Sequence, residues 1–231
     1  MGGHGTSKRY IANTPCTVPQ VQPTSFFDIG IHIELGGFAE YLDLISTNLR
    51  DHKDTFERDI EAQANRLDAR AELFDKHSDR WHALAIGFPA RFFNSFLSAL
   101  CAWSEAELAS LCRVYEGRHP NALKLSDLSD KGLRRCQTYL KRVAGVHYPD
   151  KSKEWSVLLQ LFEIRNHLAH AAASAATIGT EARELLDAHG CVAPGVDEIR
   201  LTEPFCREAM NNARGFFEQL DRALPDELKG W

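Results

Sequence analysis

Apolar residues recur at three- and four-residue steps along most of the chain, the spacing that gathers side chains on one face of an α-helix. From residue 38 to residue 84 the pattern contains no proline, so it predicts one long helix or two joined helices. Its apolar positions are Phe38, Leu42, Ile45, Leu49, Phe56, Ile60, Leu67, Ala71, Phe74, Trp81 and Leu84. The positions between them carry charges of both signs four residues apart, as expected of a solvated face.

Two further helices are predicted from residues 87–117 and 126–145. The first is the most apolar segment of the chain, with Pro89 in its expected first turn, and we predict that it forms the centre of a bundle. In the second, Ser126 or Ser129 is expected to cap the start and Gly145 the end.

The remaining pattern predicts a helix from Trp155 to about residue 173 and a final amphipathic helix over residues 203–224. Between them, glycine and proline interrupt the helical spacing near residues 189–202, where a minor β hairpin or only a loop is expected. The sequence therefore predicts an all-α, up-and-down bundle of about five helices. We expect one domain over residues 36–231, preceded by a flexible N-terminal arm over residues 1–35.

Composition narrows the class of protein. The chain has 231 residues, 44% of them hydrophobic, which suffices for a buried core, and its net charge of −5 argues against coating nucleic acid through overall charge. No apolar run approaches the roughly 18 residues of a membrane span, and no secretory signal is recognisable. The six cysteines form no CxxC pair and mostly fall in apolar helical patterns, which favours reduced, buried thiols and a cytoplasmic protein.

The stretch "LLQLFEIRNHLAHAAA", residues 158–173, places several polar groups within an apolar helix. With Trp155 as the reference, Asn166 is predicted to continue the buried stripe, flanked by Arg165 and His170. The predicted stripe comprises Trp155, Leu159, Phe162, Asn166 and Ala169. A buried guanidinium or imidazole is costly unless it is paired, so this end of the helix is expected to reach a cleft, a ligand or a partner. An arginine five residues before a histidine also arises by chance, as at Arg142 and His147.

A metal site is the alternative interpretation of the same helix. Glu163, His167 and His170 are spaced so that all three share one face, as metal ligands on a helix do. Such a site would need another ligand from elsewhere in the chain. The available histidines, His82, His119 and His147, lie near predicted helix ends or in loops.

The helix over residues 131–143 carries a basic face. From residue 118 to residue 153 the chain has nine Lys and Arg residues against three Asp residues, although it is acidic elsewhere. The basic positions of this helix are Lys131, Arg134, Arg135 and Arg142, with Lys141 at the margin. A solvated cationic face would explain them, and so would contacts to the phosphates of a nucleic acid.

At "EIRNHLAH", residues 163–170, the chain resembles the HEPN superfamily of helical nucleotide-binding domains, whose signature is an arginine, a polar residue and a later histidine. Arg165, Asn166 and His170 match that pattern. The segment over residues 95–112 resembles the central helix of the family, in which a glutamate often recurs at the place of Glu105. Residues 124–146 resemble a group of bacterial HEPN proteins, so the likeness extends over residues 88–173.

The resemblance implies a homodimer with two motifs facing each other across a shared cleft, and in many members a metal-independent endoribonuclease without a cofactor. His170 would act on the ribose 2′-OH or on the leaving oxygen, Arg165 would bind the phosphate, and Asn166 would orient His170. Glu105 and His167 would support them, and the basic face would contact RNA. Such proteins serve in toxin–antitoxin or antiviral systems, with an antitoxin such as a minimal nucleotidyltransferase as a possible partner. A silent HEPN module that binds nucleotide, RNA or a protein, and a metal-dependent hydrolase, remain the alternatives.

Overall fold

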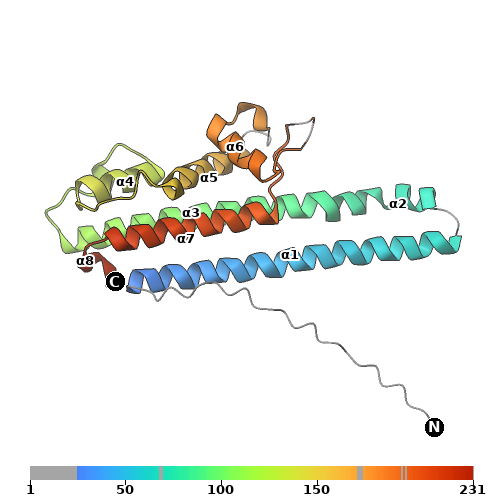
Figure 1. Cartoon of the computed structure of the whole chain (residues 1–231), viewed down its shortest axis with the longest axis horizontal. Coiled ribbons are helices and arrows are strands. Elements are labelled where there is room, and N and C mark those ends of the chain that lie inside the picture. Colours follow the sequence, from blue (N-terminus) through green and yellow to red (C-terminus); the bar gives the residue numbers. More distant parts are fainter. Residues whose placement is uncertain (1–24, 68–69, 171–173, 194, 196, 231) are drawn as a thin grey trace, which may run out of the picture.

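The computed structural model describes residues 25–67, 70–170, 174–193, 195 and 197–230, without the side chains of residues 66, 67, 70, 71, 74 and 170. It is an all-α helical bundle, as predicted (Figure 1). Its α-helices are α1 (Phe26–Leu67), α2 (Arg70–His82), α3 (Phe88–Arg118), α4 (Gly132–Arg142), α5 (Lys153–His170), α6 (Thr180–Ala188), α7 (Glu203–Ala223) and α8 (Asp226–Lys229). Three short helical turns are η1 (Ala83–Gly87), η2 (Leu125–Asp127) and η3 (Ala175–Thr177).

Helix α1 begins ten residues before the predicted domain boundary. The Ser25 hydroxyl accepts a hydrogen bond from the Asp28 N–H at 3.0 Å, which is the bond an N-cap makes. Phe27, Ile31 and Leu35 follow at four-residue steps and are buried. The prediction of a flexible arm is therefore wrong for residues 26–35, which are helical and contribute Phe27, Ile31 and Leu35 to the core. Residues 1–24 of that arm lie outside the described residues.

Helices α2 and α3 form one continuous rod through η1, a single π-helical turn. The backbones of His82, Gly87 and Phe88 stay helical, and the Phe88 N–H bonds to the Ala83 carbonyl five residues earlier. Pro89 was expected in the first turn of a new helix, and it does occupy the first turn of α3. The helix nevertheless continues through this point. The π turn before Pro89 is wider than an α-helical turn, and it accommodates a residue that has no backbone N–H to donate.

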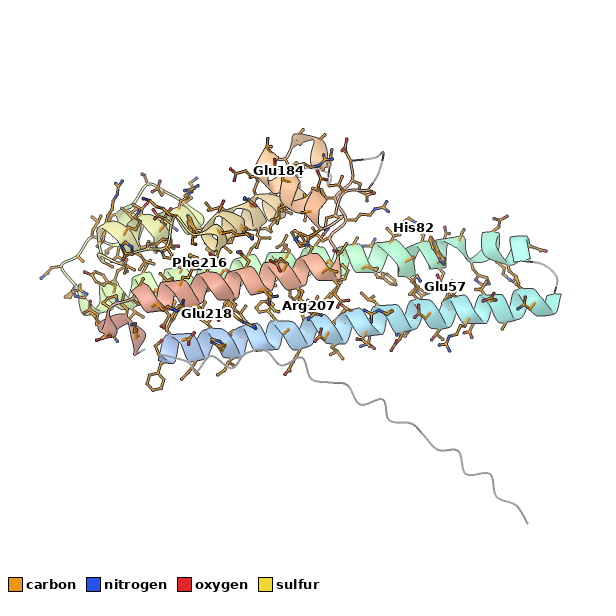
Figure 2. The ribbon with its side chains drawn as sticks, in the orientation of Figure 1. Glu57, His82, Glu184, Arg207, Phe216 and Glu218 are labelled. Carbon is orange, nitrogen blue, oxygen red and sulfur yellow. The ribbon has the colours of Figure 1, made fainter. Side chains whose placement is uncertain are left out.

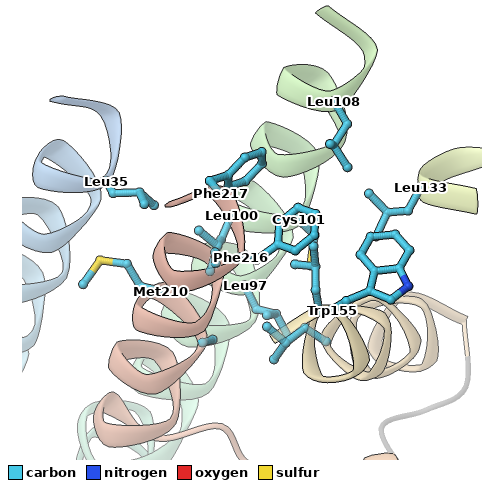
Figure 3. Packing of buried hydrophobic residues seen from close by; sticks show 14 of the residues in the cluster. Leu35, Leu97, Leu100, Cys101, Leu108, Leu133, Trp155, Met210, Phe216 and Phe217 are labelled. Atoms are coloured by element: carbon cyan, nitrogen blue, oxygen red, sulfur yellow. The ribbon is translucent and has the colours of Figure 1, made fainter. Parts of the chain in front are cut away.

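The core lies where α7 contacts α1, α3 and α5 (Figures 1 and 3). Phe216 of α7 packs against Trp155 of α5, with ring centroids 5.3 Å apart, and against Phe217 at 5.2 Å. At the other side of α7, the Arg207 guanidinium donates to Asp43 of α1 at 2.6 Å and to Glu203 at 2.8 Å (Figure 2). Aromatic packing thus holds α7 against α5, and the ion pair of Arg207 with Asp43 links α7 to α1.

The observed helix ends agree only in part with the capping residues predicted from the sequence. The end of α4 was predicted correctly, because Gly145 has φ +66° and lets the Val146 N–H return to the Leu140 carbonyl at 2.8 Å. Its start was not, since Lys131 precedes the helix and provides no side-chain cap. Helix α6 was not predicted. The hairpin near residues 189–202 reduces to one antiparallel bridge between Val192 and Ile199, which agrees with the expected minor element.

The five described cysteines are free and buried, as the apolar patterns predicted; they are Cys101, Cys112, Cys136, Cys191 and Cys206. Within the described part of the chain, one helical stretch, Asp75–Arg118, is long and apolar enough by length and composition to cross a membrane. No such stretch was predicted, because its apolar residues do not form one uninterrupted run. Phe96, Leu97 and Leu100 of this stretch are buried in the bundle, and a core helix of a soluble protein meets the same criterion.

The contact between α1 and α3 predicts a pH effect on stability. Burial raises the pKa of Glu107 above its ordinary value of 4.5, and the Glu34 carboxylate raises it further. A carboxyl with a raised pKa in the folded state costs stability when ionised, and this cost disappears as the pH falls toward the unfolded pKa. We expect Glu107→Gln to be more stable than the wild type at neutral pH, by about 0.5 kcal/mol because the site is half exposed.

This difference should vanish at about pH 3, well below the unfolded-state pKa of 4.5, where Glu107 is protonated in both states. Urea unfolding at the two pH values measures it. An equal gain at both pH values would show that the glutamine acts through packing and not through the lost charge.

Candidate functional site

A shallow groove runs along the outer face of α5, between α4 and α6. Figure 1 shows these three helices on the same side of α3. The groove is lined by Arg134 of α4, by Ser156, Leu159, Gln160, Phe162, Glu163, Asn166 and His167 of α5, and by Glu181 of α6. It combines one guanidinium, two carboxylates, two amides, an imidazole, a hydroxyl and an aromatic ring. The guanidinium, the amides and the ring suit a polar ligand that carries both phosphate and a flat base, whereas the carboxylates of Glu163 and Glu181 oppose a phosphate close to α6.

The buried face of α5 differs from the predicted one. Trp155 is buried as expected, but the stripe continues through Leu158, Leu161 and Ile164. Asn166 and Ala169, predicted to lie on this stripe, are exposed. The prediction was wrong because α5 is apolar around most of its circumference, so two stripes starting at Trp155 fit the spacing equally well.

A polar pattern in α5 would have identified the outer face. Ser156, Gln160, Glu163 and His167 follow steps of four, three and four residues and line the groove together. Glu163 and His167 were predicted as candidate site residues, whereas Ser156 and Gln160 were not. Phe162 was predicted to lie in the core, but it lines the groove.

Arg165 does not line the groove, but it contacts Phe162, which does. Its guanidinium carbon is 5.1 Å from the centre of the Phe162 ring, in cation–π contact. The side chain is half-buried, and its Nε has no hydrogen-bond partner among the described residues. Within the same part of the chain, no carboxylate forms an ion pair with Arg165. A half-buried cation without a counter-charge is unusual, since charged groups leave water mainly when they are paired.

The neighbour of Arg165 on α3 does not neutralise it. Burial raises the pKa of the Cys101 thiol to about 12, although the charge of nearby Arg165 opposes this rise. The thiol is therefore uncharged at neutral pH and contacts Arg165 as a neutral group. Figure 3 shows Cys101 in the packed layer that also holds Trp155. This contact could not be predicted, because Cys101 and Arg165 are 64 positions apart in the sequence.

Glu105 lies one turn after Cys101 on α3 and reaches the start of α4. A Cβ at Gly132, the first residue of α4, would be 3.6 Å from the Glu105 Oε1. A carboxylate at this place is stabilised by the positive end of the α4 dipole. The structure thus brings Glu105, Cys101 and Arg165 into one region between α3, α4 and α5.

The predicted basic face of α4 is only partly available for a ligand. Lys131, Arg134 and Arg142 are exposed, and Arg134 lines the groove. The Lys141 ammonium bonds to the Asp150 carboxylate, so its charge is compensated. Arg135 is half-buried beside Cys136, and its Nε has no partner among the described residues.

Glu163 and His167 hold the segment that leads into α6. Glu163 Oε1 accepts a hydrogen bond from the Gly179 N–H at 2.7 Å. His167 donates from Nε2 to the Ser174 carbonyl. Across the described residues, no three His, Cys, Asp or Glu side chains are grouped as metal ligands. His170 closes α5 one turn after Asn166, and its side chain lies outside the described residues.

We expect Glu163→Ala to lower the free energy of unfolding by about 1 kcal/mol, the value of a charge-assisted hydrogen bond near the surface. Glu184→Ala, at an exposed site on α6 (Figure 2), is the matched control and should change stability by less than about 0.5 kcal/mol. Equilibrium urea unfolding measures both variants. Equal stabilities for the two would contradict the structural role of Glu163.

The chain matches no protein-family model, no curated protein and no solved structure.

Proposed function

We propose that this protein is a metal-independent endoribonuclease that binds a single RNA strand in the α4–α5–α6 groove. The observation that carries the proposal is Arg165, a half-buried guanidinium that forms no ion pair with a carboxylate among the described residues. RNA supplies the missing anion through its phosphates, and a guanidinium suits a phosphate because it donates two parallel hydrogen bonds.

The other groove residues support the same ligand. Arg134 offers a second exposed cation on the α4 side of the groove. Asn166 and Gln160 offer amide groups, which hydrogen-bond to base edges and phosphates, and Phe162 offers an aromatic surface. Lys131 and Arg142 extend the positive charge along α4, so the affinity should fall as the salt concentration rises.

The proposed reaction is transesterification. The ribose 2′-oxygen attacks the adjacent phosphorus, the bond from phosphorus to the 5′-oxygen breaks, and a 2′,3′-cyclic phosphate and a 5′-hydroxyl result. His170, at the end of α5, removes the 2′-OH proton or protonates the leaving 5′-oxygen. Arg165 binds the phosphate oxygens, whose negative charge increases in the transition state. Asn166, one turn before His170, orients the imidazole. The Glu105 carboxylate supports the site by its position beside Gly132, at the start of α4.

A binding module that does not cleave RNA is the second candidate, and one observation favours it. Arg165 does not line the groove and its guanidinium contacts the Phe162 ring, so a side-chain movement is needed before Arg165 can reach a phosphate in the groove. In this alternative Arg134 and Asn166 bind the nucleotide, and Arg165 serves packing.

The cellular role proposed with the nuclease activity is that of a cytoplasmic toxin or antiviral effector. A protein antitoxin, such as a minimal nucleotidyltransferase, would keep its activity in check. RNA can bind in the groove of a single chain. The homodimer implied by the resemblance, with two motifs across a shared cleft, is not needed for this binding.

The test is incubation of the full-length protein with a mixed-sequence RNA in EDTA, followed by analysis of the product ends. The nuclease proposal predicts cleavage with 5′-hydroxyl and cyclic phosphate ends. Intact RNA that nevertheless binds with a salt-dependent affinity would support the binding module. Neither cleavage nor binding would contradict both candidates, and cleavage only after addition of a divalent metal would favour a metal-dependent hydrolase.

A further inference from the structure

A pocket lies between α1 and α2, in the part of the hairpin that extends past the start of α7 (Figure 1). It has a volume of about 190 Å³. Its lining residues are Phe56, Glu57, Ile60, Glu61 and Ala64 of α1 and His77 and Trp81 of α2. This pocket and the α4–α5–α6 groove share none of the described residues, so the nuclease proposal gives the pocket no role.

Three aromatic rings form much of the pocket wall. The Phe56 and His77 rings meet edge to face, with centroids 6.0 Å apart. The Trp81 Nε1 donates a hydrogen bond to the Glu57 Oε1 at 2.9 Å, which ties the indole of α2 to α1. All three aromatic residues are only half-buried, so each ring keeps an accessible surface. Aromatic faces attract cations, and tryptophan does so most strongly.

The pocket is negatively charged at neutral pH. Hydrogen bonds from Lys53 and Trp81 lower the pKa of Glu57 below its ordinary value of 4.5, so this carboxylate on the α1 side of the hairpin is ionised (Figure 2). Glu61, one turn further along α1, is exposed and forms no ion pair with a described residue. The described lining residues include no Lys or Arg. The charge and the aromatic wall together favour an organic cation as the occupant.

A surface groove continues from this pocket along α1, because Glu57 and Glu61 line both hollows. Arg58 lies in the groove and donates to the Thr55 hydroxyl at 3.1 Å and to the Asp54 backbone carbonyl at 3.2 Å. It forms no ion pair with a described carboxylate. Asp54, Glu57 and Glu61 make a row on one side of the helix, with steps of about 4.5 and 6 Å along its axis at 1.5 Å per residue.

We propose that the pocket and this row of carboxylates bind an aliphatic polyamine. One terminal ammonium enters the aromatic pocket beside Glu61. The methylene chain then follows α1, with the middle ammonium at Glu57 and the other terminal ammonium at Asp54. Lys53 contacts Asp54 at 3.8 Å and Glu57 at 3.0 Å, so the ligand shares these two carboxylates with it.

The spacing of the row selects the ligand. In an extended chain, nitrogens joined by three and by four methylene groups are about 5 and 6 Å apart. These distances match the steps from Asp54 to Glu57 and from Glu57 to Glu61. An amine with a single ammonium would occupy the pocket but leave the rest of the row unbound. An inorganic cation has the charge but no methylene groups to place against the rings.

The first test is isothermal titration of the full-length protein with spermidine, in a low-salt buffer without RNA. Spermidine contains both spacings, and we expect one site with a Kd on the order of 100 µM. Putrescine lacks one ammonium and should bind about fivefold more weakly. Mg²⁺ should show no saturable binding over the same concentration range.

Substitutions separate the pocket from general surface charge. Glu61→Gln should weaken spermidine binding about fivefold, the upper range for an exposed ion pair. Trp81→Leu should weaken it about tenfold, because the strongest aromatic face is lost. Asp59→Asn is the matched control, since Asp59 is exposed on the same stretch of α1 but lines neither hollow, and its Kd should stay within about twofold of the wild-type value. Circular dichroism shows whether each variant remains helical.

Several results would overturn the proposal: no saturable binding of spermidine, equal affinity for Mg²⁺, equal losses in Asp59→Asn and Glu61→Gln, or an unchanged affinity in Trp81→Leu. Tighter binding of a lysine-rich peptide than of spermidine would also overturn it, because the pocket would then serve a protein partner. The titration contains no RNA, so its outcome is independent of the nuclease proposal.

Discussion

His170→Ala and Arg165→Ala are each expected to lower kcat/KM for RNA cleavage in EDTA by about 10²- to 10⁴-fold. Loss of a general acid or base costs 10²- to 10⁴-fold, and loss of one donor to a developing negative charge costs about 10²- to 10³-fold. Arg165→Lys should recover only part of the loss, because lysine keeps the charge but cannot form two parallel bonds to phosphate. Steady-state cleavage of a fluorogenic oligonucleotide measures all three variants.

Matched controls separate catalysis from folding. Arg214 of α7 is also half-buried and also has an Nε without a partner among the described residues, so Arg214→Ala removes a comparable arginine outside the groove. His52 of α1 is exposed, and His52→Ala is the control for His170→Ala. Both controls should keep their kcat/KM within about twofold of the wild-type value, in line with the small effects of substitutions away from a site. Equal losses in Arg165→Ala and Arg214→Ala would assign Arg165 to packing.

The second large effect concerns the core. We expect Phe216→Ala to lower the free energy of unfolding by about 3–5 kcal/mol, as for other fully buried aromatic residues replaced by alanine. Phe216 contacts Trp155 of α5, Phe217 of α7 and Tyr148 before α5, so the cavity would open where three segments meet. This is a large part of the 5–15 kcal/mol that stabilises a typical domain.

Phe26→Ala is the control for the core prediction, because it removes an equally large side chain from an exposed site. Its stability should lie within about 0.5 kcal/mol of the wild type when both are measured at a concentration low enough for monomers. Urea unfolding followed by tryptophan fluorescence compares the two. A loss below about 1 kcal/mol for Phe216→Ala would contradict a core centred on α7.

The fold class could be predicted from the sequence because the helical period is long and regular. The apolar steps between residues 38 and 84 identified both arms of the α1–α2 hairpin, and Gly145 marked the end of α4. The start of α1 was obscured by Gly30, Gly36 and Gly37, which lower the helical propensity of a segment that tertiary packing nevertheless holds in a helix. Pro89 was taken as a helix start because a sequence does not reveal a π turn.

Some of the residues predicted for the site do line the groove, but their arrangement around it was not predicted. Asn166 and Arg134 do line one groove, although they come from different helices. Arg165 does not line the groove itself but contacts Phe162 at its edge and lies near Cys101 of α3. This could not be inferred because α5 has apolar residues on several sides. The partners of Glu163 and His167 are backbone groups of the segment before α6, which no side-chain spacing encodes.

The central claim is that RNA is cleaved through its own 2′-oxygen in this groove. Its most direct test is cleavage in EDTA of one oligonucleotide in two forms, all-RNA and with a single 2′-deoxy residue at the mapped cleavage position. The proposal predicts that the RNA is cut there and that the 2′-deoxy form is not cut at that position, because the attacking oxygen is missing. Cleavage of both forms at the same rate, or of neither, would contradict it.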